Sequence, residues 1–458
     1  MHTDEAVHGV ILGQMLETGT YRYNPVDSHG PTLYYLTWPL LQAMGVHDLA
    51  QMEAWQLRLV PALIGSAFIL SLGLWARELG LVAVMSAALY AMLAAPFAYY
   101  QRYFIHEALF VFLSLLLIWT VWRFVVDGAF RYAVGMGLTA GCLFATKETA
   151  PLVVVALGIA GALTWITQTT RPSLLILKQR IKGALIATAL FGIVFVLFYT
   201  SFGTNPHGVP DAFRAIFRFA HRATGEGHEK PWWTYLAWIF APGFYSVPWS
   251  GWIVGILVPV GVYARWNLPL VRLLSFYALV TLVLYSLIPY KTPWLELNIV
   301  APAILLAGVG ASALYSWAQK PWRPVLYIVG GVFILALGNE TARLCFENPA
   351  DARNPLAYSP TVGDIENLVQ AVNAKSPNHD AYIQVVSDDY WPLPWYLRHE
   401  KNVGYWASLP APLSGDIIIT SPDQLAQVQA RLGPGWTVQF FGLRPGVLAV
   451  VLSRGAKK

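Results

Sequence analysis

The chain has 458 residues, of which 56% are hydrophobic and only 12% are charged. An ordinary soluble domain carries roughly 25% charged residues. The composition therefore excludes a soluble enzyme, a nucleic-acid-binding protein and a disordered chain, and it indicates a polytopic membrane protein. The net charge of +5 does not indicate nucleic acid, because Lys and Arg are spread over many short loops. Cys142 and Cys345 are too far apart in the sequence to suggest a disulfide framework or a Cys-based metal site.

Ten apolar runs are long enough to cross a bilayer. The predicted spans are 57–76, 81–100, 107–126, 131–147, 149–167, 184–201, 246–264, 273–289, 296–316 and 324–339. A shorter run at 33–46, interrupted by Pro39, predicts an interfacial helix. Charged residues are denser after residue 340 than before it. The sequence thus predicts a transmembrane domain over 1–339 and a small water-facing domain over 340–458.

The positive charges predict the orientation of the spans. One set of five short loops carries eleven Lys and Arg, whereas the short hairpins on the other side carry only Arg102, Lys147 and Lys291. The protein is expected in the cytoplasmic membrane, with the first set of loops in the cytoplasm. The segments 1–56, 201–245 and 340–458 are then outside. Ten spans also put both termini outside. Either a further transmembrane helix precedes Met1, or insertion of the next span carries the N-terminal tail across.

Ionisable residues are almost absent from the middles of the predicted spans, where ion-coupled transporters usually need them. They gather instead at the outer ends. The gathered residues are Asp4, Glu5, His8, His29, Arg58, Arg102, His106, Glu107, Lys147, Glu148, His228, Glu229, Lys230, Lys291 and Glu296. Cations stabilise phosphate, and a carboxylate can act as the base for an acceptor hydroxyl. The arrangement therefore suits chemistry on a lipid-linked phosphate.

The first outer loop begins with two adjacent carboxylates flanked by histidines, in the sequence His-Thr-Asp-Glu-Ala-Val-His. In the functional interpretation, Asp4 is a general base and Glu5 or His8 supports it. In the alternative, the acids only stabilise a helix N-terminus. His29 follows in a His-Gly-Pro turn, where it belongs to the site or is incidental.

Two outer hairpins place charges next to span ends. Glu107 opens a span and must be solvated or paired, and Arg102 is then either a site residue or its partner. Lys147 and Glu148 lie between two apolar runs. Either both belong to the site, or Lys147 snorkels to the interface and Glu148 is solvated at a tight turn.

The later outer loops offer two more lysines. The His228-Glu-Lys230-Pro-Trp-Trp segment either stacks on a sugar, with Lys230 near phosphate, or forms an interfacial aromatic belt. Lys291 lies in a tight turn and is either a phosphate contact or a snorkelling lysine. The sequence lacks a Walker loop, a nucleotide fingerprint, a His-Glu-x-x-His motif and a nucleophile elbow.

Taken in order, these motifs resemble the GT-C glycosyltransferases. The resemblance rests on the outer Asp-Glu pair, the His-Gly-Pro turn, the Arg58-x-x-Pro-Ala-Leu-x-Gly motif, Arg102 with Glu107, and Ala-Thr-Lys-Glu at 145–148. The chain looks most similar to the dolichyl-phosphate-mannose protein mannosyltransferase type, glycosyltransferase family 39. Within it, the segments 227–232, 290–294 and 391–398 resemble the branch associated with flippase activity in archaeal N-glycosylation.

The resemblance implies an inverting hexosyl transfer from a polyprenyl-phosphate sugar donor to an acceptor hydroxyl, at the outer face of the membrane. The family's first-loop Asp corresponds to Asp4 and its second-loop acid to Glu107, which are the predicted catalytic residues. Arg102, Lys147 and Lys291 are the predicted phosphate contacts. The remaining predicted substrate contacts are Glu5, His8, His29, Arg58, His106, Glu148, His228 and Lys230. The family has a transmembrane helix before its Asp-Glu loop, which supports the expectation of a helix preceding Met1.

The expected partners are the lipid-linked donor, the bilayer, and a protein or glycan acceptor. The sequence identifies no cofactor, and a divalent metal held by Asp4 and Glu107 stays open. Two alternatives remain: a flippase, or flippase-associated protein, for lipid-linked sugars without transferase activity, and an anchored envelope protein with a structural role.

The segment 340–458 predicts a small α/β domain. Strands are expected at Tyr382–Val386 and Asp416–Thr420, a helix at Pro422–Leu432, and a pair of strands over Trp436–Leu452 around a turn at Gly442–Gly446. The first strand is followed by Asp388, Asp389 and Tyr390. These residues either bind a ligand or, more simply, cap the start of a helix. The predicted fold class is a mainly α membrane protein, with a GT-C-like helical bundle and this small extracytoplasmic domain.

Overall fold

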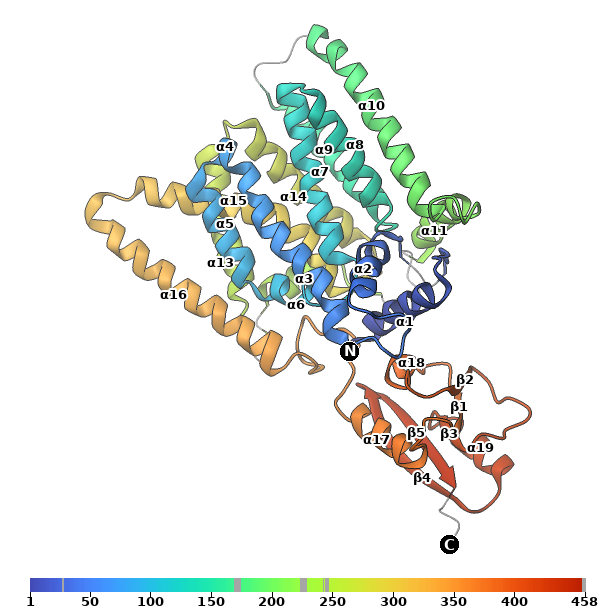
Figure 1. Ribbon diagram of the computed structural model, residues 1–458. Coiled ribbons are helices and arrows are strands. Elements are labelled where there is room, and N and C mark those ends of the chain that lie inside the picture. Colours follow the sequence, from blue (N-terminus) through green and yellow to red (C-terminus); the bar gives the residue numbers. More distant parts are fainter. Residues whose placement is uncertain (27–28, 169–173, 223–228, 242, 244–246, 455–458) are drawn as a thin grey trace.

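A computed structural model describes the chain apart from residues 27–28, 169–173, 223–228, 242, 244–246 and 455–458. Long helices form a bundle, and a small sheet domain lies at one end of it (Figure 1). Each predicted span contains a helix or two successive helices. The helices are α3 (Ala54–Ser71, continued to α4, Ala76–Leu79), α5 (Leu81–Leu93) with α6 (Ala95–Tyr100), α7 (Glu107–Asp127), α8 (Phe130–Phe144), α9 (Ala150–Ile166), α10 (Leu174–Tyr199), α13 (Trp249–Arg265), α14 (Pro269–Leu287), α15 (Glu296–Trp317) and α16 (Arg323–Thr341).

Within the described part of the chain, six helical stretches are long and apolar enough to cross a membrane. The helices α5 and α9 are apolar but shorter. The fold class is therefore confirmed as a mainly helical, multi-pass membrane protein with a small sheet domain.

Small residues let the central helices approach closely. A Cβ atom on Gly310 of α15 would lie 2.1 Å from the Leu257 carbonyl oxygen of α13, and one on Gly261 would lie 2.2 Å from the Leu306 carbonyl oxygen. Likewise, a Cβ atom on Gly308 would lie 2.1 Å from the Ala83 carbonyl oxygen of α5. The helix α15 is thus the buried centre of the bundle, and 83% of its most apolar window lies inside the protein.

Four shorter helices cover the end of the bundle next to the sheet domain. They are α1 (Thr3–Thr18), α2 (Thr32–Ala43), α11 (Gly208–Arg222) and α12 (Thr234–Phe240). The helix predicted at 33–46 is confirmed as α2. The helices α11 and α12 lie in the predicted outer loop 201–245 and were not predicted, because they are too short or too polar to read as spans.

The sheet domain has five strands in the order β2-β1-β3-β5-β4. β1 (Tyr382–Val386) pairs in parallel with β2 (Asn402–Trp406) and β3 (Ile417–Thr420), and β5 (Val447–Arg454) pairs antiparallel with β3 and β4 (Trp436–Arg444). Alternate side chains face opposite layers: Ile383 and Val385 pack with α17 (Ile365–Lys375) and α18 (Leu393–Tyr396), and Ile418 packs with α19 (Leu425–Leu432). The predicted elements β1, β3, α19, β4 and β5 are confirmed, whereas β2, α17 and α18 were not predicted.

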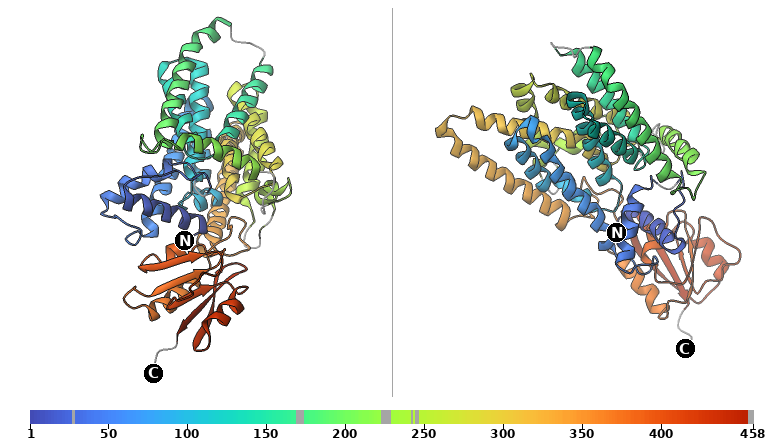
Figure 2. Two further views of the ribbon diagram at one scale, coloured as in Figure 1. Left: turned by 90° about the vertical axis from the view of Figure 1, so that its right-hand side faces the viewer. Right: turned by 45° about the horizontal axis from the view of Figure 1, so that its top comes forward.

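The two predicted sets of loops lie at opposite ends of the bundle. The hairpins predicted to be outside adjoin α1, α2 and the sheet domain, whereas α4 and the start of α10 lie at the far end (Figures 1 and 2). At that far end Arg123 is buried and bonds to Glu78 and Asp127. The ionisable groups of the outer hairpins therefore do converge on one end, as predicted; which end faces the cytoplasm stays a prediction.

Candidate active site

A cavity of about 780 Å³ lies where the first loop and α11 meet the sheet domain. Its wall combines segments that are far apart in the sequence. Residues lining it include Asp4, His8, Arg22, His29, Glu148, Ala215, Arg218, Phe219, Tyr290, Trp294, Tyr358, Ser359, Tyr390, Trp391 and Arg444. This volume is in the range of cavities that bury a small-molecule ligand. We call it the main cavity.

Asp4 lies half-buried on the wall of the main cavity. Its main-chain N–H donates to Nδ1 of His2 (3.1 Å), so the first turn of α1 is fixed. Among the residues that the structure describes, none forms a hydrogen bond or an ion pair with its carboxylate. Glu148 is the other acid on this wall, and both of its oxygens accept hydrogen bonds. Asp4 is therefore the carboxylate that is free to act on a ligand.

Glu5 is fully buried and fully bonded. Its oxygens accept from Arg58 Nε (2.8 Å) and Nη2 (2.7 Å), from the His2 main-chain N–H (2.8 Å) and from the Phe104 N–H (3.0 Å). Burial raises the pKa of this carboxyl, but the Arg58 guanidinium and the backbone donors outweigh burial and hold the pKa below its usual value. The structure thus places Glu5 in a clamp joining α1, α3 and the loop before α7.

Three histidines meet beside Asp4's helix. The ring of His8 lies 4.8 Å from that of His106 and 5.8 Å from that of His29, and the last two are 5.2 Å apart. His8 Nδ1 bonds to the Tyr34 hydroxyl (2.7 Å), and His106 Nε2 bonds to the Gly30 carbonyl (2.9 Å). Burial, followed by the charge of neighbouring histidines, lowers the pKa of both His8 and His106 well below the usual value, so both are neutral near pH 7.

Glu148 joins this group through His29. Its Oε2 pairs with His29 Nδ1 (2.9 Å), and its Oε1 accepts from the Tyr23 hydroxyl (3.0 Å). Glu148 therefore holds the His-Gly-Pro turn of the first loop against the hairpin before α9.

Glu107 and Lys147 form a buried ion pair, in which Lys147 Nζ donates to Glu107 Oε1. Neither residue lines the main cavity. The structure therefore does not bring these two predicted site residues to the same cavity as Asp4. The pair instead joins the start of α7 to the hairpin before α9, and the predicted catalytic role of Glu107 stays a prediction.

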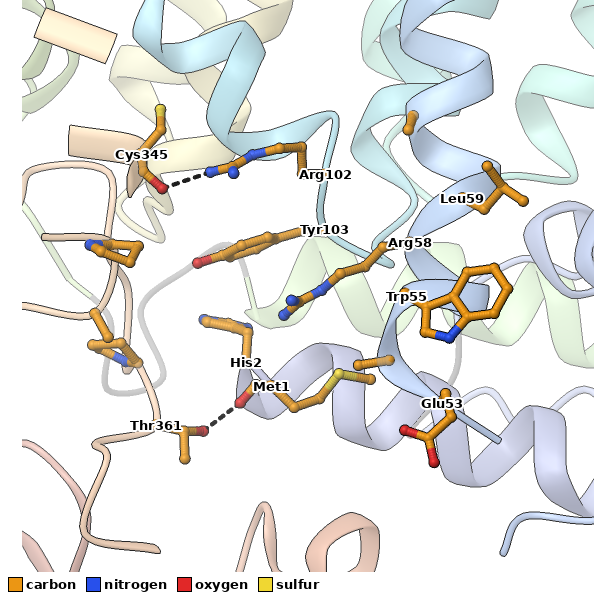
Figure 3. A pocket seen from close by; sticks show the side chains of 15 residues that line it. Met1, His2, Glu53, Trp55, Arg58, Leu59, Arg102, Tyr103, Cys345 and Thr361 are labelled. Carbon is orange, nitrogen blue, oxygen red and sulfur yellow. Dashed lines mark hydrogen bonds between the residues drawn. The ribbon is translucent and has the colours of Figure 1, made fainter. Parts of the chain in front are cut away.

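Arg58 and Arg102 lie in a second cavity of about 760 Å³, next to α3. Tyr103 lies between the two side chains (Figure 3). Arg102 donates to the carbonyls of Ala98 (2.9 Å) and Cys345 (2.7 Å). Among the described residues, no carboxylate pairs with it. The alternative in which Arg102 pairs with Glu107 is therefore not seen, and its role as a site residue stays a prediction. Instead, Arg102 joins the loop before α7 to the segment after α16.

Lys230 and Lys291 lie close together beside the main cavity. The Lys230 N–H donates to the Pro289 carbonyl (3.0 Å), and its ammonium lies 5.6 Å from the centre of the Tyr358 ring. Lys291 is buried and donates to the Ile288 carbonyl. Burial lowers the pKa of both lysines, and for Lys291 the charge of Lys230 adds to the effect. The predicted site residue His228 lies outside the described residues.

The structure adds wall residues that the sequence did not single out. Arg22, Arg218 and Arg444 bring the positive charge that borders the main cavity, and Tyr358 brings aromatic surface. Trp391, the first residue of the motif at 391–398, adds to this aromatic surface. Asp389, predicted as a ligand site or a cap, bonds to Arg444, while Tyr390 lines the cavity. The pattern of arginines among phenylalanines in 208–222 was the one signal that could have identified Arg218.

In the part of the chain that is described, no three His, Cys, Asp or Glu side chains are arranged to hold a metal ion. A metal held by Asp4 and Glu107, which the sequence left open, would have to displace Lys147 from the Glu107 carboxylate. The described residues therefore give a metal no preformed set of three ligands.

No known protein-family model matches the sequence, and no curated protein matches it significantly. Solved structures do match its fold. ArnT from Cupriavidus metallidurans, bound to undecaprenyl phosphate, is 14% identical with a TM-score of 0.70, over 99% of this chain and 94% of that one. The Archaeoglobus fulgidus oligosaccharyltransferase, in complex with zinc and sulfate, is 11% identical with a TM-score of 0.55, over 96% of this chain and 69% of that one.

The arabinofuranosyltransferase AftD from Mycobacteria is 14% identical with a TM-score of 0.51, over 100% of this chain and 38% of that one. These proteins are GT-C glycosyltransferases. The chain therefore has the GT-C fold, as the sequence motifs predicted. The narrower resemblance to family 39 and to its flippase-linked branch stays a prediction.

Proposed function

We propose that this chain with a GT-C fold is a membrane glycosyltransferase, which moves a sugar from a polyprenyl-phosphate donor to an acceptor hydroxyl outside the cytoplasm. One observation carries the proposal: Asp4 presents a carboxylate without a partner among the described residues to a cavity of substrate size. Two further facts support it. The fold is that of glycosyltransferases, and one protein of this fold binds undecaprenyl phosphate.

The reaction places Asp4 as the general base. Its carboxylate takes the proton of the acceptor hydroxyl, and the hydroxyl oxygen attacks the anomeric carbon of the donor. The bond from that carbon to the phosphate oxygen breaks, and the electron pair leaves with the phosphate. A single displacement of this kind inverts the anomeric configuration. Positive charge near the leaving phosphate stabilises it, and Arg22 and Arg218 are the exposed guanidinium groups on this wall.

The bonded acids support this role indirectly. The clamp of Glu5 with Arg58 holds the first turn of α1, and the pair of Glu107 with Lys147 holds the helix start beside His106. Both pairs are buried, so breaking either would leave an uncompensated charge in the protein. We assign Glu5 and Glu107 as positioning residues and Asp4 as the catalytic residue.

The test is sugar transfer from a labelled polyprenyl-phosphate hexose, in membranes that hold the full chain. We expect Asp4→Asn to lower transfer by roughly 10²–10⁴-fold, the usual contribution of a general base. Glu17→Gln is the matched control, because Glu17 lies on the same helix, is exposed and lies outside the main cavity, and it should keep full transfer.

Three results would decide the matter. Equal transfer by wild type and Asp4→Asn, at equal expression, would exclude Asp4 as the base. Movement of lipid-linked sugar across the membrane without transfer would favour the flippase alternative. Loss of wild-type transfer with a chelator, restored by a divalent cation, would show that a metal takes part.

A further inference from the structure

The helix α11 has three different faces, although the sequence around it reads as one polar loop. Ala212 and Ala215 are buried against the protein. Phe213 and Phe217, one turn apart, are 53% and 73% exposed. Arg214 and Arg218 are also exposed and form a row beside the phenylalanines. A basic amphipathic helix with exposed aromatic residues is typical of a helix that lies in a membrane interface.

The position of α11 agrees with this chemistry. It follows α10, whose segment Arg180–Tyr199 is apolar enough to span a membrane and is only 11% buried. A Cβ atom on Gly208 would lie 1.7 Å from the Tyr199 carbonyl oxygen, so the start of α11 is pressed against the end of that span. The Phe213 ring lies 5.8 Å from Phe195 of α10. Phe195 is itself buried, so Phe213 contacts the inner side of the span, while Phe217 stays exposed beside a span that is mostly unburied. The exposed aromatic row therefore lies next to a segment with a large lipid-accessible surface.

The arginine row links this surface to the main cavity. Arg214 pairs with Asp211 on the same helix (2.7 Å). Arg218 has no ion-pair partner in the described residues, and together with Ala215 and Phe219 it lines the main cavity. One helix is thus in contact with the expected lipid surface and with the wall beside Asp4.

We propose that α11 lies in the bilayer interface, with Phe213 and Phe217 among the acyl chains, and that Arg218 binds a lipid phosphate at the edge of the main cavity. The partner of this face is an anionic lipid surface, because guanidinium groups bind phosphate. The second part rests on the proposed function: a lipid-linked donor would enter the cavity sideways over α11, with its phosphate on Arg218.

The position of the helix is tested without any activity, using the full chain in nanodiscs that contain phosphatidylglycerol. An environment-sensitive fluorophore is attached to a single cysteine, in a background carrying Cys142→Ala and Cys345→Ala. The labelled variants are Phe217→Cys, Arg214→Cys and, as a water-exposed apolar control, Phe440→Cys. Nitroxide groups on the lipid chains report contact with lipid, and iodide reports contact with water.

We expect the label at 217 to be quenched by the nitroxide lipids, and the labels at 214 and 440 to be quenched mainly by iodide. Iodide quenching at 217 as strong as at 440 would overturn the proposal, because the helix would then lie in water. Shielding of 217 from both quenchers would also overturn it, because another protein surface would then cover the aromatic row.

The phosphate contact is tested by titrating the lipid-linked donor. Arg218→Gln should raise the KM for the donor on the order of tenfold, because a charge-assisted hydrogen bond to the phosphate is lost. It should also lower kcat, because the same guanidinium is placed to stabilise the leaving phosphate. Arg214→Gln is the matched control and should leave KM unchanged, since Arg214 does not line the cavity. An unchanged KM in Arg218→Gln would overturn the phosphate contact. An absence of transfer by wild type would contradict the proposed function, while the quenching result would still stand or fall by itself.

Discussion

Asp4 and Glu5 show that environment, and not residue type, separates an unpaired acid at a cavity from a bonded, structural one. Adjacent positions on α1 point them in different directions. Glu5 is fully buried and accepts bonds from Arg58 and from two backbone N–H groups, whereas Asp4 borders the main cavity. The sequence predicted that both acids belong to one site. It could not predict which of them is bonded, because the donors come from α3 and from the loop before α7.

The buried histidines predict how stability depends on pH. His8 and His106 have lowered pKa values in the folded protein, chiefly through burial. The unfolded chain therefore takes up protons first as the pH falls, and the folded state loses stability below about pH 6.5, the usual pKa of histidine, by up to about 1.4 kcal/mol for each unit of pKa difference. We expect the apparent Tm in detergent to fall between pH 7.5 and pH 5.5.

His106→Gln tests this source of the effect. Glutamine can still donate to the Gly30 carbonyl but cannot take up a proton, so the Tm of this variant should vary less with pH. The exposed His47 supplies the control, and His47→Gln should follow the wild-type curve. A His106→Gln curve parallel to the wild-type curve would show that the acid sensitivity arises elsewhere.

At the scale of elements, the first loop is held to the hairpin before α9 by direct backbone contact. The Gly30 N–H donates to the Thr146 carbonyl (3.1 Å), and the Thr32 N–H donates to the Ala145 carbonyl (3.3 Å). A Cβ atom on Gly30 would lie 2.1 Å from the Ala145 carbonyl oxygen. Only glycine fits there unless the two backbones separate.

Gly30→Ala should therefore separate the loop from the hairpin. We expect a lower apparent Tm, by several degrees, and reduced transfer, because His29 and His106 would lose their alignment. Gly158→Ala is the control, since nothing lies within 4 Å of a Cβ atom at that position of α9. Equal thermal curves for the two variants would contradict the close packing seen at Gly30.

Helices and strands could be predicted where one physical requirement dominated the choice of their residues. A segment inside a bilayer must be apolar and must satisfy its own backbone, so a helix at each of the ten predicted spans could be read from apolar runs. In the described part of the chain, six helical stretches are long and apolar enough to cross a membrane. The strands β1, β3 and β5 could be read from short runs of apolar and β-branched residues, because both faces of these strands are covered. The helix α11 has too few apolar residues for a span, and β2 contains Gly404 and only intermediate burial, so neither carried a clear signal. Lys147 and Glu107 looked like site residues because the sequence does not show that they neutralise one another.

At the scale of the whole molecule, the sheet domain forms part of the main cavity, because it is docked on α1. A Cβ atom on Gly9 of α1 would lie 2.9 Å from two ring carbons of Trp395 in α18. The Trp395 side chain is 3% exposed, and the Arg398 guanidinium stacks on it at 4.5 Å. The sheet domain held by this contact contributes Trp391 and Arg444 to the wall of the cavity that Asp4 also lines.

Trp395→Ala should weaken the docking by about 3–5 kcal/mol, the usual cost of truncating a buried tryptophan. We expect faster proteolysis between α16 and α17 and a loss of sugar transfer, although the bundle itself stays folded. Phe440→Ala, on an exposed position of β4, should change neither property. If Trp395→Ala kept wild-type protease resistance, another contact would have to hold the sheet domain in place.

The convergence of ionisable residues on one end of the molecule could be predicted, because charges avoid the bilayer interior. How these residues are divided between two cavities and the buried interior could not be predicted. The structure separates Arg58 and Arg102 into a second cavity, and it buries Lys147 and Lys291. That division depends on packing between segments distant in the sequence, such as the segment after α16 that accepts from Arg102.

The backbone contact at Gly30 and Thr32 also limits how often the first loop separates from the hairpin before α9. The amide protons of these two residues are locked by carbonyls of a different hairpin, so they can exchange with heavy water only when the two segments part. The same parting would release the carbonyl that His106 holds and free the turn that carries His29. His29 is already partly exposed, whereas His106 is fully buried, so the frequency of this parting limits how often the His106 ring meets solvent.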